Sequence, residues 1–282
     1  MTRSFASFVF VLILGVAGIL GGCASSDKAS KAIEEKPVEQ LYSEARAAFG
    51  REEYKTAARL FDEVERQHPY SSLAIQSNIM SAYSSYQAED YAMSVATLDR
   101  FIEMHPGNKN IAYAYYLRAI CFYEQIVDVG RDQDMTRRAT DALEDVMRRF
   151  PGTPYARDAK FKRDLTWDHL AGKEMEIGRF YLKRKYYQAA INRFKTVVDT
   201  YQTTTHVPEA LHRMVEAYVA LGLTDEATRI AAVLGHNYPG SEWYESSYAL
   251  LETGKTKQIV STRAEATTTA GKLKNSILNI FD

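Results

Sequence analysis

A short pattern of small, large and helix-ending residues recurs five times between residues 54 and 239, and it constrains the fold more than any other feature. Four copies end at a proline that follows an aromatic residue or a histidine, and one ends at a glutamine that follows Tyr201. The residue 12 positions before each endpoint is Ala or Ser. The residue eight positions before it is Phe or Leu in four copies. Such agreement indicates one supersecondary unit used five times. The endpoints are Pro69, Pro106, Pro151, Gln202 and Pro239.

The spacing inside this pattern predicts a helix that packs closely on a neighbouring helix. A small side chain allows close approach, and a large apolar one a helical turn later fills the space beside it. Proline then ends the helix, because it lacks an N–H and clashes with the preceding turn. The small positions are Ala57, Ser94, Ala139, Ala190 and Ala227, and the positions a turn later are Phe61, Leu98, Leu143, Phe194 and Ala231.

A second small or β-branched position, 24 residues before four of the endpoints, indicates the partner helix. It is occupied by Ala45, Ala82, Gly178 and Val215. The resulting helix pair resembles the tetratricopeptide repeat, although the 37 residues from Pro69 to Pro106 slightly exceed that repeat's usual length of about 34. We therefore expect an all-α fold, a tetratricopeptide-repeat solenoid of about five helix pairs with a capping helix. The alternative is an ordinary helical bundle whose register agrees by accident.

The predicted repeat domain covers residues 38–252. The third repeat is longer than the first two, and its extra residues fall around 126–135, where Gly130 and several Asp residues indicate a loop. The fourth repeat is expected to begin with one long helix, and the last repeat needs a cap because it would otherwise expose its apolar face. The predicted repeats are 38–69, 71–106, 108–151, 154–202 and 206–239, with the cap at 242–252.

The first 22 residues read as a secretory signal peptide. Arg3 precedes an apolar run from Phe8 to Leu20, and small residues precede Cys23. The apolar run is too short for a comfortable membrane span. The ending Leu20-Gly-Gly-Cys23 resembles a bacterial lipobox, which implies that Cys23 is acylated and that two or three lipid chains anchor the protein stably. An incidental cysteine behind a plain signal peptide is the alternative.

Two flanking segments lack the repeat pattern. Residues 23–37 are polar after the cysteine and are predicted to be a flexible tether. Residues 253–282 are rich in Thr, Lys and Ala, and we expect most of this tail to be disordered. A short amphipathic stretch from Leu273 to Phe281 is as compatible with a partner-docking helix as with a frayed end.

The sequence carries no recognisable active-site motif. It has no Gly-rich phosphate loop, no zinc-protease motif and no nucleophile elbow, and its six histidines form no i,i+4 pair for a metal. The net charge of −1, without a basic stripe, argues against nucleic acid as a partner. Cys121 stands in an apolar helix and is expected to be a buried thiol. We therefore expect no catalysis, no metal and no cofactor beyond the lipid on Cys23.

A stack of helix pairs forms a concave groove lined by the first helix of each pair. In the first three repeats the positions expected to face this groove are mainly aromatic. Aromatic side chains with an occasional arginine are typical of peptide-binding surfaces. Some of these tyrosines could instead belong to the core between repeats. The groove positions are Tyr42, Arg46, Phe49, Ile79, Tyr83, Tyr86, Tyr116, Ile120 and Tyr123.

The lipobox, the five repeats and the chain length together resemble the BamD family, lipoproteins of the β-barrel assembly machinery. The match extends over nearly all of the chain after Cys23. It includes His68-Pro69-Tyr70-Ser71, the segment Gly172-Lys-Glu-Met-Glu-Ile-Gly-Arg-Phe-Tyr181, and the loop Asp128-Val-Gly-Arg-Asp-Gln133, which looks typical of an α-proteobacterial branch. The tail after Thr253 is longer than this family's pattern, so the resemblance assigns it no role.

The resemblance implies a non-enzymatic subunit on the periplasmic face of the outer membrane. Family members bind BamA through their C-terminal repeats, alongside other subunits of the complex. An Arg in an Asn-Arg pair makes that contact, and Asn192-Arg193 matches it here. Arginine suits such a site because its planar fork binds a carboxylate with two hydrogen bonds.

The same resemblance implies that the N-terminal repeats receive unfolded outer-membrane β-barrel proteins. Their C-terminal signal is aromatic and ends in a carboxylate, which an aromatic groove with Arg46 or Arg100 could recognise. Two alternatives compete with this interpretation. One is another repeat lipoprotein, such as a secretin pilotin or a periplasmic scaffold, and the other is an enzyme or a solute-binding lipoprotein, which would need a polar pocket with convergent titratable groups.

Overall fold

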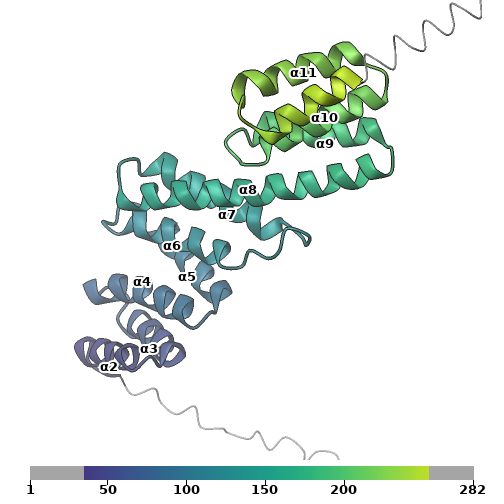
Figure 1. The fold of residues 1–282 in the computed structure, drawn as a ribbon. Helices are drawn as coiled ribbons and strands as arrows, with labels where there is room; N and C mark the ends of the chain where they lie inside the picture. The colour runs from purple at the N-terminus through teal and green to yellow at the C-terminus, as the bar shows by residue number, and fades with distance from the viewer. Residues whose placement is uncertain (1–34, 254–282) are drawn as a thin grey trace, which may run out of the picture.

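A computed structural model describes residues 35–253, which form a staggered stack of helices without any strand (Figure 1). The predicted signal peptide, Cys23, the predicted tether up to residue 34 and the tail from residue 254 lie outside the described residues. The first three helix pairs are α2 (Val38–Gly50) with α3 (Tyr54–Gln67), α4 (Ser72–Gln87) with α5 (Tyr91–Met104), and α6 (Ile111–Tyr123) with α7 (Asp134–Arg149). The last two are α8 (Pro154–Lys183) with α9 (Tyr187–Thr200), and α10 (Val207–Ala220) with α11 (Thr224–Asn237).

These five pairs, followed by a helical segment at 242–253, confirm the predicted all-α repeat solenoid. Each pair falls within one predicted repeat, and the first helix begins at Val38, where the repeat domain was expected to start. The last segment packs on the final pair, because Leu251 joins the cluster around Val215 and Ala227. This segment therefore covers part of the apolar face of the last pair.

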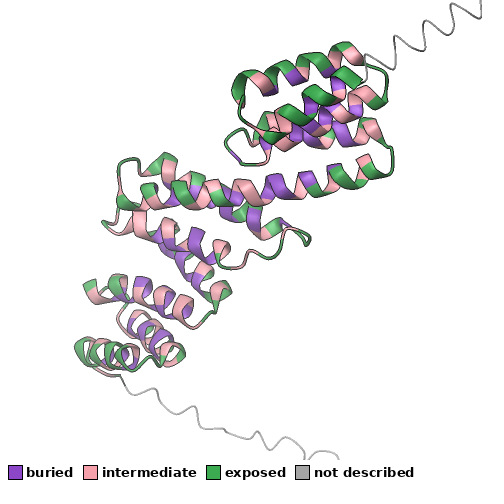
Figure 2. Cartoon of the chain, viewed as in Figure 1, coloured by how far each residue is buried: buried purple, intermediate pink, exposed green. Residues whose placement is uncertain are grey.

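The recurring sequence pattern corresponds to the contact between the two helices of a pair. All five small positions are fully buried, and four of the five larger ones are as well. Figure 2 shows buried residues along the inner sides of the stacked helices. The helices approach closely at Gly178 of α8, where an added Cβ would lie 2.4 Å from Cε1 of Phe194 on α9. The pattern was detectable in the sequence because this packing allows few residue types.

Four of the pairs use the same turn between their two helices. The turn contains one residue with positive φ, and the next residue donates its N–H to a carbonyl five positions back. This is the hydrogen bond of a Schellman motif, which satisfies carbonyls left free at a helix end. The positive-φ residues are Glu52, Glu89, Lys185 and Gly222.

The third pair replaces this turn with the loop 124–133, close to the predicted 126–135. Gln133 is 2% exposed, and its Nε2 donates to the carbonyl oxygens of Asp128, Val129 and Arg131 at 3.2–3.3 Å. The backbone N–H of Gly130 donates to Oδ1 of Asp128 at 2.7 Å. The inserted residues thus form a loop with its own internal hydrogen bonds.

Helix α8 connects the two halves of the molecule. It has 30 residues and continues without interruption through Ala171 and Gly172. Its first half packs on α6 and α7 around Ala159, and its second half packs on α9 and α10 around Met175. Among the labelled helices, none of α2–α7 contacts any of α9–α11. No helix within residues 35–253 is both long and apolar enough to cross a membrane.

Candidate functional site

A row of half-buried aromatic side chains crosses the first helices of the first four repeats. Phe49 of α2 lies 5.7 Å from Tyr83 of α4, measured between ring centroids, and Tyr83 stacks on Tyr86 at 6.2 Å. Tyr155 at the start of α8 lies 5.7 Å and 5.3 Å from two tyrosines of α6. These separations are in the range that aromatic pairs prefer. We call Phe49, Tyr83, Tyr86, Tyr113, Tyr116 and Tyr155 the aromatic row.

The two tyrosines of α6 connect the parts of the row. Tyr113 packs against the same core cluster as Tyr83 and Tyr86. Burial is the main cause that raises the pKa of Tyr113, and burial together with a hydrogen bond to Asp158 raises the pKa of Tyr116. The row therefore presents rings that are partly accessible, which suits contact with apolar or aromatic segments.

The row ends at a charged pair on α8. The hydroxyl of Tyr116 donates to Oδ2 of Asp158 at 2.5 Å, and Nζ of Lys162 lies 3.0 Å from the same oxygen. Burial acts to raise the pKa of Asp158, but the hydrogen bonds from Tyr116 and Lys162 hold it below its usual value. Lys162 Nζ also lies 5.7 Å from the ring centroid of Tyr123, so a cation stands at this end of the row.

The structure brings together only part of the predicted groove. Tyr42 packs edge-on against Phe61, with 5.7 Å between centroids, and so belongs largely to the core of the first pair. Ile79 and Ile120 were expected to face the groove, but they are only 7% and 5% exposed and are core residues. The groove positions were chosen by their i, i+4 and i+7 spacing along one helix. This spacing includes Ile79 and Ile120 because it does not account for the helix that packs next to them. Phe49, Tyr83, Tyr86 and Tyr116 do form one surface, and Tyr123 lies at its end.

The two candidate arginines of the groove differ in position. Arg46 is exposed on α2, a first helix. Arg100 lies on α5, a second helix, where its Nη2 is 3.5 Å from Oε2 of Glu65 on α3. Its only described ion pair therefore joins two second helices, away from the aromatic row. Tyr113 and Tyr155 were not among the predicted groove positions. Tyr155 lies in the fourth repeat, whereas the prediction covered only the first three, and Tyr113 lies on α6 outside the single row of positions that was considered.

A cavity of about 540 Å³ continues the groove below the loop 124–133. Its apolar lining includes Ile126 and Val127 of the loop and Leu165 of α8, which is 55% exposed. Phe161, one turn before Leu165, is 71% exposed. His169 also lines the cavity, and its Nδ1 is buried without a hydrogen-bond partner. The accessible apolar surface thus extends from the aromatic row to the middle of α8.

Two partly exposed ion pairs join neighbouring helices in the C-terminal half. Nη1 of Arg193 on α9 lies 3.1 Å and 3.5 Å from the two carboxylate oxygens of Glu174 on α8. Arg193 retains 43% of its side-chain exposure. Arg179 and Glu209 form a similar pair between α8 and α10 at 3.0 Å. Exposed pairs of this kind contribute little to stability, so their charges remain available to a partner.

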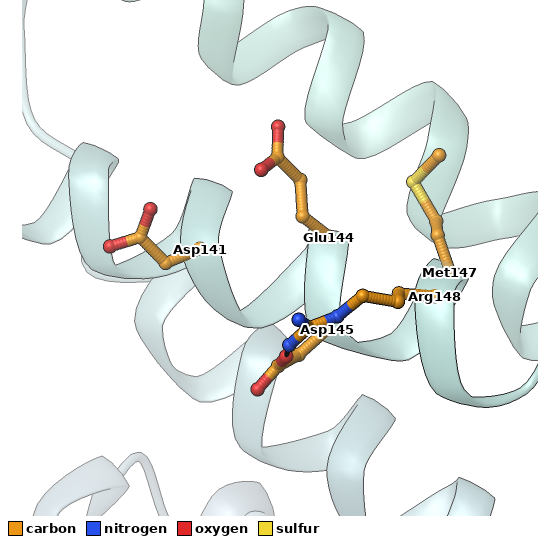
Figure 3. Close-up of a pocket in the computed structure, with 5 residues that line it drawn as sticks. All are labelled: Asp141, Glu144, Asp145, Met147 and Arg148. Atoms are coloured by element: carbon orange, nitrogen blue, oxygen red, sulfur yellow. Dashed lines mark hydrogen bonds and ion pairs between the residues drawn. The ribbon is translucent and has the colours of Figure 1, made fainter.

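The described residues contain no arrangement that resembles a catalytic or metal site. The cavity of about 630 Å³ in Figure 3 is lined by side chains of α7 alone, and its Arg148 is paired with Asp145. No group of three His, Cys, Asp or Glu residues within 35–253 could hold a metal ion. Cys121 is fully buried as expected, and burial raises the pKa of its thiol to about 11, so it is a poor nucleophile.

Comparison with known proteins gives a consistent set of relatives. A family model described as an outer membrane lipoprotein matches residues 34–234. A Caulobacter vibrioides protein named outer membrane protein assembly factor BamD is 51% identical over 237 residues, covering 84% of this chain and 78% of its own. A Rickettsia prowazekii protein of the same name is 47% identical over 242 residues, covering 86% and 95%. Among solved structures, a thermophilic TPR protein of Thermus thermophilus is similar over 76% of this chain and 99% of its own, at 16% identity and a TM-score of 0.36.

Proposed function

This chain belongs to the BamD family of outer membrane protein assembly factors, and from that premise we propose that it is a non-enzymatic subunit of the β-barrel assembly complex. It would lie on the periplasmic face of the outer membrane, anchored by lipid on Cys23. The repeat scaffold supports a binding role, because stacked helix pairs offer extended surfaces. Its two binding tasks, substrate capture and docking on BamA, fall on different halves of the chain.

Substrate capture belongs to the aromatic row, and this row is the observation that carries the proposal. Unfolded outer-membrane proteins would place aromatic residues of their C-terminal signal against it. Tyrosine rings supply large contact areas at low entropic cost and dominate binding energy at many interfaces. Lys162 at the end of the row, or Arg46 on α2, would attract the terminal carboxylate of the signal.

BamA docking belongs to the C-terminal repeats, with Arg193 as the central residue. In the free chain the guanidinium of Arg193 is held by Glu174 on the neighbouring helix. This contact fixes the direction of a long side chain before a partner arrives, which lowers the entropic cost of binding. A carboxylate of BamA could then compete with Glu174 for the exposed part of the guanidinium.

The first test is a detergent pull-down of the tagged full-length chain from membranes, with BamA as the readout. Arg193→Glu should reduce BamA recovery at least tenfold, because it reverses the charge that the partner would contact and leaves it beside Glu174. Glu174→Gln is the matched control, since it removes the internal ion pair and keeps Arg193. If both variants lost BamA equally, BamA binding would depend on the ion pair between Arg193 and Glu174 and not on the charge of Arg193 alone. If even the parent chain recovered no BamA, a pilotin or scaffold role would replace the proposal.

The second test measures binding of a synthetic peptide with an aromatic residue at its C-terminal carboxylate. Tyr83→Ala with Tyr86→Ala should weaken binding by roughly thirtyfold or more, the scale of a hot-spot loss of about 2 kcal/mol. Tyr70→Ala is the control, because Tyr70 is fully exposed and lies outside the row. Equal weakening by the control would show that the peptide binds exposed tyrosines in general.

A further inference from the structure

The four equivalent turns of the solenoid share their backbone but differ sharply in their side chains. In the first two repeats the turns read Arg51-Glu52-Glu53 and Ala88-Glu89-Asp90, and both are rich in acids. In the last two they read Arg184-Lys185-Tyr186 and Leu221-Gly222-Leu223. All four contain the same positive-φ position and the same backbone hydrogen bond. The fold therefore does not require basic or apolar residues in the last two turns.

The turn between α8 and α9 concentrates positive charge and exposed rings. Lys183, Arg184 and Lys185 are consecutive and exposed, and no acidic residue occurs between 179 and 188. Phe180 is 50% exposed and Tyr186 is 60% exposed. The Arg184 guanidinium lies 4.3 Å from the centre of the Phe180 ring, which keeps the cation beside an accessible ring.

The turn between α10 and α11 adds apolar side chains next to this charge. Leu221 and Leu223 are 42% and 47% exposed. The residues behind the two turns, Leu182 and Tyr218 among them, pack against one core cluster. Figure 1 shows both turns at the same end of the C-terminal helices. We call Phe180, Lys183, Arg184, Lys185, Tyr186, Leu221 and Leu223 the basic-apolar edge.

We propose that the basic-apolar edge binds the surface of a membrane that contains anionic phospholipid. Cations attract the acidic headgroups, while Phe, Tyr and Leu side chains enter the boundary between headgroups and acyl chains. The apolar residues stand on the tips of turns, where a flat surface can reach them. The neighbouring hollow of about 400 Å³ is less suited to a ligand, because Arg213 and Glu216 in its lining already pair with each other at 2.8 Å.

The acids near the edge limit the strength of this interaction but do not cancel it. Asp225 and Glu226 lie in the first turn of α11, which begins at Thr224. Glu226 is engaged by Arg229. Asp225 makes no ion pair within residues 35–253, and the three cations of the edge outnumber it. We expect weak binding that strengthens when another anchor holds the chain at a membrane, and that weakens as salt screens the charges.

The test is flotation of the full chain with lipid vesicles, with Cys23→Ser to remove the predicted anchor. Vesicles of phosphatidylcholine alone are compared with vesicles that also contain phosphatidylglycerol. We expect binding only to the anionic vesicles. Lys183→Glu, Arg184→Glu and Lys185→Glu together should weaken it about a hundredfold, since each cation near an anionic surface strengthens binding about fivefold. Leu223→Ser should weaken binding severalfold.

The triple variant should fold, because glutamate already occupies the positive-φ position in the turns at Glu52 and Glu89. Lys55→Glu, Arg59→Glu and Lys109→Glu form a matched control of three exposed cations elsewhere. Equal loss in this control, or full vesicle binding by the triple variant of the edge, would overturn the proposal. Unchanged vesicle binding with loss of BamA in the pull-down would also overturn it and would assign the edge to an acidic protein surface.

Discussion

The N-terminal half, α2–α7, and the C-terminal half, from the second part of α8 to residue 253, share one packing rule and differ on their surfaces. The same small and large positions are buried in both. Outside, the first half shows the aromatic row, whereas the second shows the basic-apolar edge. Ion pairs between helices occur in both halves. The repeat core therefore leaves surface positions free to specialise. One scaffold can present two chemically different surfaces to two partners.

The relation between the halves depends on a small connecting region. The loop 124–133 reaches α8 at its middle, where Nζ of Lys173 donates to the carbonyl of Gly130 at 2.8 Å. An added Cβ at Gly172 would lie 3.4 Å from both Val129 and His206, so the backbone of α8 is in close contact with segments on either side. Substitutions within each half, and in the region that connects them, should therefore affect different parts of the molecule.

The largest effect is expected from removing the buried ring of one repeat. Phe61 and Phe194 occupy equivalent positions in their repeats. Replacing either with alanine should lower the free energy of unfolding by about 3–5 kcal/mol. Because the labelled helices of the two halves meet only through α8, the first change should speed hydrogen exchange in α2–α4 and spare α9–α11. The second should do the reverse. Faster exchange throughout the chain in both variants would show that the halves form one cooperative unit.

The next effect comes from the close approach of α8 and α9. Glycine to alanine inside a helix usually stabilises, by up to about 1 kcal/mol. At Gly178 the sign should reverse to a loss of about 1–3 kcal/mol, because the new Cβ would overlap the ring of Phe194. Phe194→Leu should relieve part of this loss in a double-mutant cycle of thermal unfolding. Gly50→Ala in the N-terminal half is the control, since an added Cβ there meets nothing within 4 Å.

Contacts within a helix pair could be predicted from the sequence, whereas contacts between adjacent repeats could not. Gly178 and Phe194 were found from sequence because their contact permits few residue types. Repetition showed the Gly178 position in four repeats and the Phe194 position in five. The positions of Ile79 and Ile120 were assigned wrongly, because their burial depends on the adjacent repeat and not on their own helix. The pair between Arg193 and Glu174, and the cation beside Tyr123, required knowledge of which helices adjoin. Spacing along one helix does not contain that information.

A moderate effect is expected in the loop that connects the halves. Gln133→Ala removes three hydrogen bonds to loop carbonyls and one from the hydroxyl of Thr136, which donates to Oε1 at 2.8 Å. Buried groups left without partners cost about 1–3 kcal/mol. We expect faster proteolysis within 124–133, with little change in the unfolding of α2–α5. Asp132→Ala, an exposed change in the same loop, should leave the proteolysis rate unaltered. Resistance of the Gln133 variant to proteolysis would mean that contacts to α8 alone hold the loop.

The smallest effect concerns pH and the cap at 242–253, which ends the C-terminal half. His212 of α10 is 6% exposed, and its Nδ1 lies 2.8 Å from Oγ of Ser247 in the cap. Burial lowers the pKa of His212, and Arg213 acts in the same direction, while Glu216 and Glu209 oppose it. The folded chain thus favours the neutral imidazole. Its contribution to stability is complete above the ordinary histidine pKa of about 6.5 and is lost as pH falls through the lower, folded value.

Trp243 can report this loss locally, because its ring centroid lies 5.3 Å from that of His212. The chain has only two tryptophans, so Trp167→Phe leaves Trp243 as the single tryptophan, whose emission can be excited selectively over that of tyrosine. Its fluorescence should change as the pH falls below about 6.5, while the melting temperature of the N-terminal half stays constant. His212→Gln should abolish the pH dependence, and Ser247→Ala should cost about 1 kcal/mol at neutral pH through the lost hydrogen bond. A parallel acid response in α2–α5 would contradict a local role for His212. A response confined to the cap would establish that the two halves also differ in how they end: the N-terminal half continues into α8, whereas the C-terminal half is closed by a contact that acid weakens.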